Sequence, residues 1–220
     1  MTWHRLIVLI FTLGYTLSFG VYYLVNGNAE FIWYVITLII FISVIGGTLK
    51  RTRFSPIMLW ALSLWGLLHM MGGGIIVNGQ VLYALVVFPI VTAGDASILK
   101  FDQIVHFYGF AMATVAMFYL LKPVVTEEGS EGRTLLLSFL AGMGLGALNE
   151  IIEFIAVVSF PDTNVGGYFN TGLDLVFNMA GALIAITLIY VRERLPERLK
   201  FEVREPQWLQ GNVKEDLKKL

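Results

Sequence analysis

The sequence predicts an all-α polytopic membrane protein with a six-helix transmembrane bundle, and three observations lead to this prediction. The mean hydropathy is +0.75. Hydrophobic residues make up 57% of the chain and charged residues only 14%, whereas soluble domains carry about 25% charged residues. Six apolar runs each approach the roughly 20 residues that a helix needs to cross a hydrocarbon core of about 30 Å. We therefore expect the lipid bilayer as the main partner.

The six runs are separated by short polar or charged connections. The first run has a long apolar core and no A-x-A-like cleavage site after it, so we expect a retained anchor rather than a signal peptide. The runs are Arg5–Val25, Phe31–Thr48, Pro56–Val77, Phe101–Leu121, Thr134–Phe160 and Gly172–Val191.

The basic residues predict the orientation of these helices. If both termini lie on one side, every Lys and Arg except Lys100 falls on that side. Because cytoplasmic connections are rich in Lys and Arg, we expect both termini in the cytoplasm. We interpret residues 1–191 as the transmembrane domain and residues 192–220 as a charged cytosolic tail.

The longest external connection covers residues 78–100. Asn78-Gly79 lies between two apolar runs, which is a strong hairpin signal. The following run, Ala84–Val91, is too short to span a membrane. We expect an external hairpin or re-entrant lid packed on the external mouth of the bundle, and the alternative is a half-length seventh helix.

One glycine pattern lies within a predicted helix. Gly142-x-x-x-Gly146 falls in the fifth run. Such spacing is typical of close helix packing, and we prefer this interpretation. The chain has no Gly-rich nucleotide loop, and we expect no nucleic-acid partner.

Polar residues in four runs share one depth in the predicted membrane. With a rise of 1.5 Å per residue, they lie roughly 5–15 Å from the external boundary. Ionisable groups inside membrane helices are costly and usually functional, so we expect them to converge on one site. These residues are His69, Asp102, His106, Glu153, Asp174 and Asn178.

The spacing of these residues favours a metal site. Asp102 and His106, like Asp174 and Asn178, are four residues apart and share a helix face, and Glu150 lies three residues before Glu153. Helical bundles build metal sites from such carboxylates and imidazoles. Because the chain has no cysteine, Zn, Mg, Mn and Fe are the candidate divalent ions. The expected ligands are Asp102, His106, Glu150, Glu153 and Asp174.

Other roles remain open for several of these residues. Asn149 and Asn178 are expected beside the ligands, or as hydrogen bonds between helices. His69 is either a general base or a histidine of the core, and Asp102 is alternatively a helix N-cap. Glu150 and Glu153 alternatively share a proton. We expect Glu30, Asp95 and Asp162 to be solvated external charges.

Four segments resemble the YjdF-like family of uncharacterised prokaryotic inner-membrane proteins: Leu68–Gly73, Phe101–Phe107, Asn149–Phe154 and Thr171–Ala182. The last three also resemble VanZ-like proteins, in which Asp-x-x-x-His, Glu-x-x-Gln/Glu and Asp-x-x-x-Asn-x-x-Gly recur in this order. The resemblance implies a multi-pass protein of the prokaryotic plasma membrane and emphasises the same polar residues. It carries over no established reaction.

We hypothesise a divalent-metal-dependent hydrolase that acts on a lipid or cell-envelope precursor, with Glu150 or His69 as the general base. The alternatives are a proton- or cation-coupled transporter and a non-enzymatic membrane protein whose polar or metal cluster is structural. The inner halves of the last four runs contain no acid or histidine, which disfavours the transporter. The sequence leaves the oligomeric state open.

Overall fold

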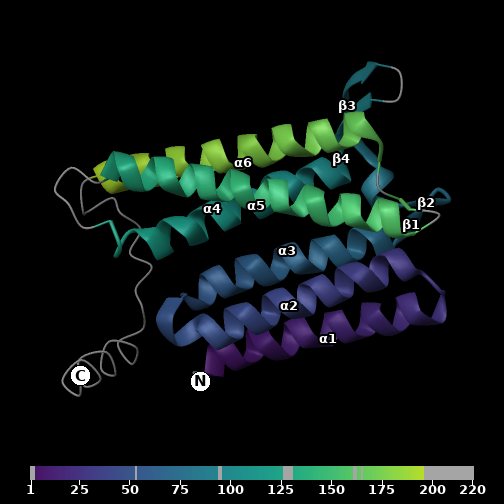
Figure 1. Cartoon of the computed structure of the whole chain (residues 1–220), viewed down its shortest axis with the longest axis horizontal. Helices are drawn as coiled ribbons and strands as arrows, with labels where there is room; N and C mark the ends of the chain where they lie inside the picture. The colour runs from purple at the N-terminus through teal and green to yellow at the C-terminus, as the bar shows by residue number, and fades with distance from the viewer. Residues whose placement is uncertain are drawn as a thin grey trace. The chain divides into compact units, whose positions relative to one another are not determined.

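The computed structural model describes residues 3–52, 54–93, 96–125, 131–160, 163–164 and 166–195. Within these residues, six helices are long and apolar enough to cross a membrane. The predicted six-helix membrane bundle is therefore confirmed (Figure 1). The helices are α1 (Trp3–Val25), α2 (Ala29–Thr52), α3 (Pro56–Gly74), α4 (Phe101–Leu121), α5 (Glu131–Ser159) and α6 (Tyr168–Arg194). Most of the predicted tail lies outside the described residues.

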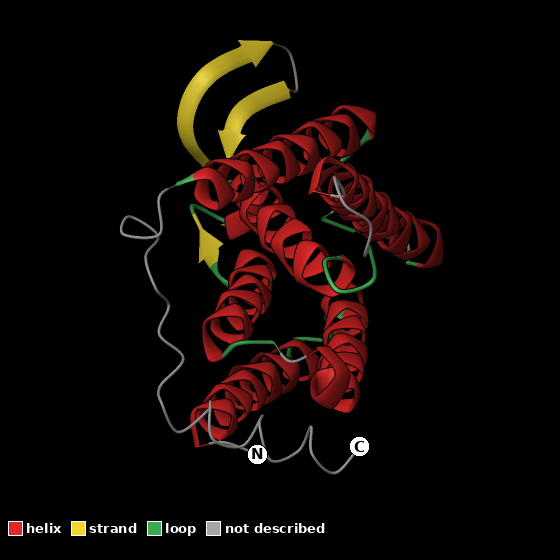
Figure 2. Cartoon of the chain, turned by 90° about the vertical axis from the view of Figure 1, so that its left-hand side faces the viewer, coloured by secondary structure: helices red, strands yellow, loops and turns green. Residues whose placement is uncertain are grey.

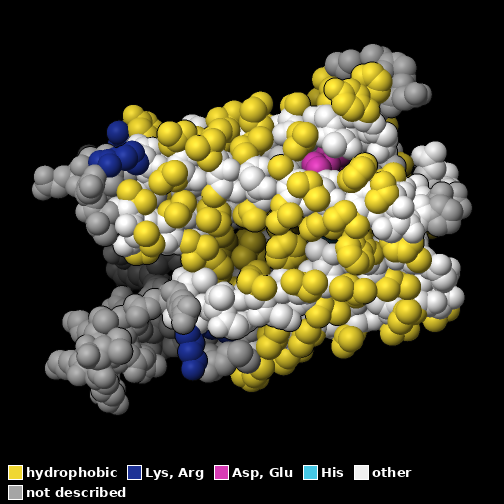
Figure 3. Space-filling model, viewed as in Figure 1, with side chains coloured by type: hydrophobic (Ala, Val, Ile, Leu, Met, Phe, Trp, Pro, Cys, Tyr) yellow, Lys and Arg dark blue, Asp and Glu magenta, His cyan; other side chains and the backbone are white. Residues whose placement is uncertain are grey.

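The two ends of the bundle differ in composition. One end, the hairpin end, carries the connection between α3 and α4. The other end, the basic end, carries Arg5, Lys50, Lys122 and Arg133 near helix termini. Figure 3 shows Lys and Arg side chains at the end opposite the hairpins. The prediction that both termini lie in the cytoplasm depends on this gathering of Lys and Arg at one end.

Helix α3 has clear start and stop signals. Ser55 caps its first turn by accepting a hydrogen bond from the Met58 amide at 3.2 Å, and Pro56 follows at the first helical position. The helix ends at Gly74, so the prediction that it continues to Val77 is wrong. Three glycines, Gly72–Gly74, let aromatic rings approach the backbone, and the chain becomes extended at Ile75.

The connection after α3 contains two hairpins. Strand β1 (Ile76–Val77) pairs with β2 (Gln80–Val81), and Asn78 and Gly79 between them have φ values of 52° and 80°. Positive φ at both positions is typical of a type I′ turn. The predicted hairpin is confirmed, and the alternative of a half-length helix is wrong for the described residues.

The second hairpin leaves the bundle. A short 3₁₀ helix, η1 (Leu82–Ala84), connects the first hairpin to strands β3 (Val86–Ala93) and β4 (Ala96–Lys100). Figures 1 and 2 both show β3 and β4 projecting from the helices. In contrast, η1 packs on the helices, because the Tyr83 hydroxyl donates to the His69 carbonyl at 2.8 Å. Strand β2 and η1 are thus the parts of the predicted lid that pack against α3.

Helices α4, α5 and α6 pack closely at glycines. A Cβ atom on Gly142 would meet the Thr114 side chain of α4, and one on Gly146 would lie 2.9 Å from Nδ2 of Asn178 in α6. Gly181 of α6 lies directly against the Phe107 carbonyl of α4. The predicted close packing at Gly142-x-x-x-Gly146 is confirmed.

Replacing Gly181 by Ala should destabilise the bundle by about 1–3 kcal/mol, because the new methyl group would clash with backbone. Gly144→Ala on α5 is the matched control, since a Cβ there meets nothing within 4 Å. Thermal unfolding of the detergent-purified variants measures the difference. Equal transition temperatures for the two variants would contradict the packing described here.

Candidate metal centre

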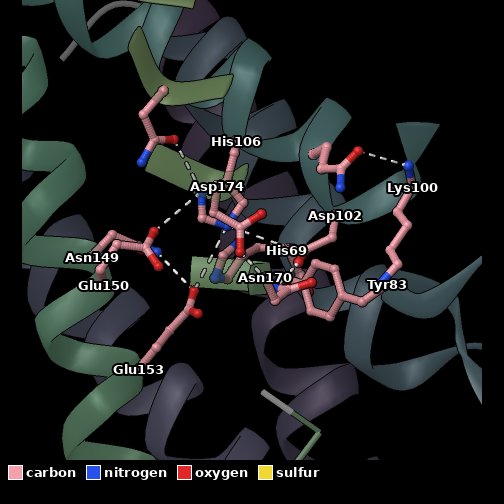
Figure 4. Close-up of polar contacts among 12 residues, drawn as sticks. His69, Tyr83, Lys100, Asp102, His106, Asn149, Glu150, Glu153, Asn170 and Asp174 are labelled. Carbon is pink, nitrogen blue, oxygen red and sulfur yellow. Dashed lines mark hydrogen bonds and ion pairs between the residues drawn. The ribbon is translucent and has the colours of Figure 1, made fainter. Parts of the chain in front are cut away.

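His106 lies at the centre of the polar cluster, with a side chain that is almost fully buried. Its Nε2 atom lies 3.5 Å from Oδ1 of Asp102 and 3.8 Å from Oε1 of Glu153. Its Nδ1 atom lies 3.5 Å from Oε1 of Glu150 and 3.0 Å from Oδ1 of Asn178. Figure 4 shows the labelled side chains of His106, Glu150 and Glu153 pointing toward one another. The residues predicted on the fourth, fifth and sixth helices therefore meet at one site.

The α6 side of the cluster is ordered by two asparagines. Asn170 donates from Nδ2 to Oδ2 of Asp174 at 2.6 Å and to Oδ2 of Asp102 at 3.1 Å. Asp174 is fully buried, one helical turn after Asn170. Asn170 thus connects the carboxylates of α4 and α6, while Asn178 contacts the imidazole. Asn170 was not among the predicted site residues.

The α5 side contributes two carboxylates on one helix face. Asn149 donates from Nδ2 to Oε1 of Glu153 at 2.8 Å, one helical turn away. Glu150 is buried, and within the described residues neither of its carboxylate oxygens has a hydrogen-bond partner. Asn149 therefore orients Glu153, whereas Glu150 stays available to another ligand.

The donor atoms form two overlapping groups that share His106. One group contains Asp102 and Asp174, and the other contains Glu150 and Glu153; in each group the donor atoms lie within 4.8 Å of one another. The separations of 3.5–3.8 Å from the imidazole exceed hydrogen-bond lengths of about 2.7–3.2 Å. Ligands of a tetrahedral ion with bonds of about 2.0–2.2 Å lie roughly 3.3–3.6 Å apart. The separation of 3.5 Å between Nε2 of His106 and Oδ1 of Asp102 therefore fits two ligands of one cation, whereas Glu150 faces Nδ1 on the other side of the imidazole ring.

Buried polar atoms without partners give independent support. In the described part of the chain, Oδ1 of Asp174 and Nε2 of His106 form no hydrogen bond, as is true of both Glu150 oxygens. Buried polar groups in proteins are nearly always paired, and each exception needs an explanation. A divalent cation held by one of the two groups would satisfy the unpaired donor atoms of that group.

His69 lies beside this cluster rather than within it. Its ring makes edge-to-face contacts with Tyr34, Trp65 and Tyr83, at centroid distances of 5.6–6.4 Å. Its Nδ1 atom has no hydrogen-bond partner among the described residues. The alternative of a core histidine is thus partly right, since aromatic rings surround it. Its Nδ1 nevertheless remains unpaired.

A small pocket of about 30 Å³ borders the cluster at the hairpin end. That space is comparable with the roughly 30 Å³ that one water molecule occupies in the liquid. Burial raises the pKa of the Tyr83 phenol well above its usual range, so its hydroxyl remains a hydrogen-bond donor. The residues around the pocket include His69, Tyr83, Asp102, Glu153, Asn170, Tyr34 and Glu30.

The prediction that Glu30 is a solvated charge is wrong. Glu30 is only 3% exposed, and its Oε2 atom accepts hydrogen bonds from the amide and the side chain of Asn164 at 2.8 and 2.9 Å. Helix α2 therefore contributes Glu30 and Tyr34 to the walls of the small pocket. Asp95 and Asp162, which the same prediction covered, lie outside the described residues.

Residues 6–194 match the family described as "Predicted membrane protein (DUF2238)". An uncharacterised protein of Thermotoga maritima is 32% identical over 94 residues, which are 42% of this chain and 49% of that protein. This chain thus spans about half the length of that curated relative. No solved structure matches the chain.

The finer resemblance to YjdF-like and VanZ-like proteins stays a prediction. The match covers all six helices, and the chain belongs to the DUF2238 family of predicted membrane proteins.

Proposed function

We propose that this membrane protein is a divalent-metal-dependent hydrolase that acts on a lipid or cell-envelope substrate at the hairpin end. The observation that carries the proposal is the cluster of four carboxylates around one imidazole, with several donor atoms unpaired in the described part of the chain. The proposed metal ligands are Asp102, His106, Glu150, Glu153 and Asp174, and the candidate ions are Zn, Mg, Mn and Fe.

Charge balance favours a cation at this position. Within the described residues, no Lys or Arg forms an ion pair with these four acids, and His106 alone offsets at most one negative charge. A charged side chain at the centre of a membrane helix costs about 2.5–3.5 kcal/mol or more. A divalent ion would offset two of the negative charges of the four acids, and His106 as a metal ligand would be neutral.

The side chains around the ion would have distinct roles. A bound divalent ion supplies positive charge that polarises an ester or phosphoester and favours deprotonation of water. Glu150, where it does not bind the ion, or His69 would accept the water proton, since neither Glu150 oxygen forms a hydrogen bond within the described residues. The hydroxyl group of water would bond to the carbonyl carbon or the phosphorus, the bond from that atom to the ester oxygen would break, and the proton would pass to that oxygen of the leaving alcohol. Asn149, Asn170 and Asn178 would hold the carboxylates and the imidazole in place.

The two alternatives remain distinguishable. The carboxylates of the cluster gather toward the hairpin end, and the larger cavity on the basic side of His69 has mostly apolar walls. An ion pathway needs polar groups along its length, so these features favour the hydrolase over the transporter. A structural metal cluster would bind the ion equally well but would catalyse no hydrolysis.

Elemental analysis of the detergent-purified protein tests the metal site. We expect near-stoichiometric metal in the wild type and its loss in Glu153→Gln and His106→Ala, because each change removes a donor atom. Glu30→Gln is the matched control, since Glu30 lies at the same end but is paired with Asn164. A wild type without metal after reloading with Zn and Mn would falsify the metal proposal.

Asn170→Ala should lower the metal affinity about 10–100-fold without removing a ligand, because it frees the carboxylates of Asp102 and Asp174. Titration of the metal-free protein with Zn or Mn measures this affinity. Asn164→Ala is the control and should leave the affinity unchanged. An affinity equal to that of the wild type would show that Asn170 does not orient the ligands.

Hydrolysis of phospholipids or lipid-linked envelope precursors by the purified protein should stop on chelation and return when the metal is restored. Release of the headgroup or of a fatty acid, followed by mass spectrometry, is the measurement. Bound metal without any turnover would favour the structural alternative. Charge-coupled cation flux in proteoliposomes would favour the transporter.

A further inference from the structure

A second, larger cavity of about 360 Å³ lies between α1, α2, α3 and part of α5. Its volume falls within the range of about 300–1,000 Å³ typical of small-molecule pockets. Figure 3 shows a hydrophobic recess in the middle of the face that it displays. The carboxylates of the cluster do not line this cavity.

The walls of this cavity are suited to a hydrocarbon chain. Leu38, Ile42, Leu62 and Ile152 are among the apolar side chains that line it. Some polar groups in the wall are paired: Thr12 Oγ1 and Ser63 Oγ lie 2.7 Å apart, and the Tyr15 hydroxyl donates to the Ser63 carbonyl at 3.0 Å. Arg5, Trp65 and His69 also line the cavity, and within the described residues each has one ring or guanidinium nitrogen without a hydrogen bond.

The length of the cavity fits one lipid chain. Along α3 its lining extends from Leu59 to Met70, which corresponds to roughly 16 Å at 1.5 Å per residue. Half of a hydrocarbon core of about 30 Å, the depth that one leaflet fills with acyl chains, is about 15 Å. A single acyl chain would therefore extend along most of the cavity.

The cavity also shares wall residues with the polar site. Tyr34 and His69 line both the large cavity and the small pocket that borders Asp102 and Glu153. Asn149 lines the cavity as well, and it donates to Glu153 of the cluster. An amphiphile with its chain in the cavity would thus hold its first polar groups beside the carboxylates.

We propose that the substrate of the carboxylate–histidine site is a membrane lipid with one acyl chain in this cavity and its headgroup linkage at the cluster. This assignment rests on the proposed function, and it names the substrate class and the position of the chain. The second chain of a diacyl lipid would stay in the bilayer. From the headgroup linkage at the cluster, the acyl chain would extend toward the basic end, with its terminal methyl group near Leu49 and Leu59.

Two neighbouring glycines of α2 offer a matched test. Gly46 lines the cavity and Gly47 does not, and at both positions an added Cβ meets nothing within 4 Å. Gly46→Phe should therefore fill the basic end of the cavity without a clash, while Gly47→Phe should leave the cavity open. The first variant should shorten the chain that the protein accepts.

The probe is phosphatidylglycerol with a photoreactive diazirine at the end of a palmitoyl chain, added to the metal-free protein in lipid nanodiscs. We expect crosslinks at Leu49 and Leu59 in the wild type and in Gly47→Phe, and loss of these crosslinks in Gly46→Phe. A lauroyl probe, being shorter, should label Leu38 and Leu62 in all three proteins. Size-exclusion profiles establish that the variants are folded.

Crosslinks confined to membrane-facing residues such as Ile39 and Ile40, or identical patterns in both variants, would overturn the inference. Because the experiment uses metal-free protein, it does not depend on hydrolysis. Crosslinks in the cavity of a protein that never binds metal would support the proposed position of the acyl chain and contradict the metal-dependent hydrolase. Bound metal without crosslinks in the cavity would support the metal site and contradict the proposed position of the acyl chain.

Discussion

The contact between one buried imidazole and polar side chains from three helices is the interaction on which the arrangement of α4, α5 and α6 depends. His106 meets Asp102 on its own helix, Glu150 and Glu153 on α5, and Asn178 on α6. These groups lie in an apolar bundle, where an unpaired polar atom is far costlier than in water. The helices must therefore approach closely, and glycines at their contacts allow this approach.

The bundle combines two kinds of interior that rarely occur so close together. On the α4–α6 side, the interior is polar and rich in carboxylates. On the α1–α3 side, aromatic residues pack around Met70, and the Tyr23 hydroxyl donates to the Met70 carbonyl at 2.5 Å. His69 and Tyr34 lie between these regions, with contacts to both pockets. The amphiphilic substrate proposed above would contact both kinds of interior.

Sequence reasoning recovered the helices and most of the cluster, because the apolar runs and the shared depth of the acids are local signals. The run Phe101–Leu121 agrees with α4 at both ends. Asn170 was missed because the last helix was predicted to begin at Gly172, whereas it begins at Tyr168; the four-residue spacing to Asp174 was the available signal. The burial of Glu30 depends on Asn164, which lies 134 residues later, and no local pattern reveals such a contact.

The polar partners of α4 that lie on α6 are synthesised later than α4 itself. Asn170 lies 68 residues after Asp102, and Asn178 lies 72 residues after His106. At about 5–20 residues per second, a ribosome needs roughly 4–14 s to make 72 residues. Helix α4 is therefore synthesised seconds before Asn170 and Asn178. During that time Asp102 and His106 have no contact with α6. Insertion of this protein is complete only when α6 arrives, so the residues that build the site also make its assembly a late step of biogenesis.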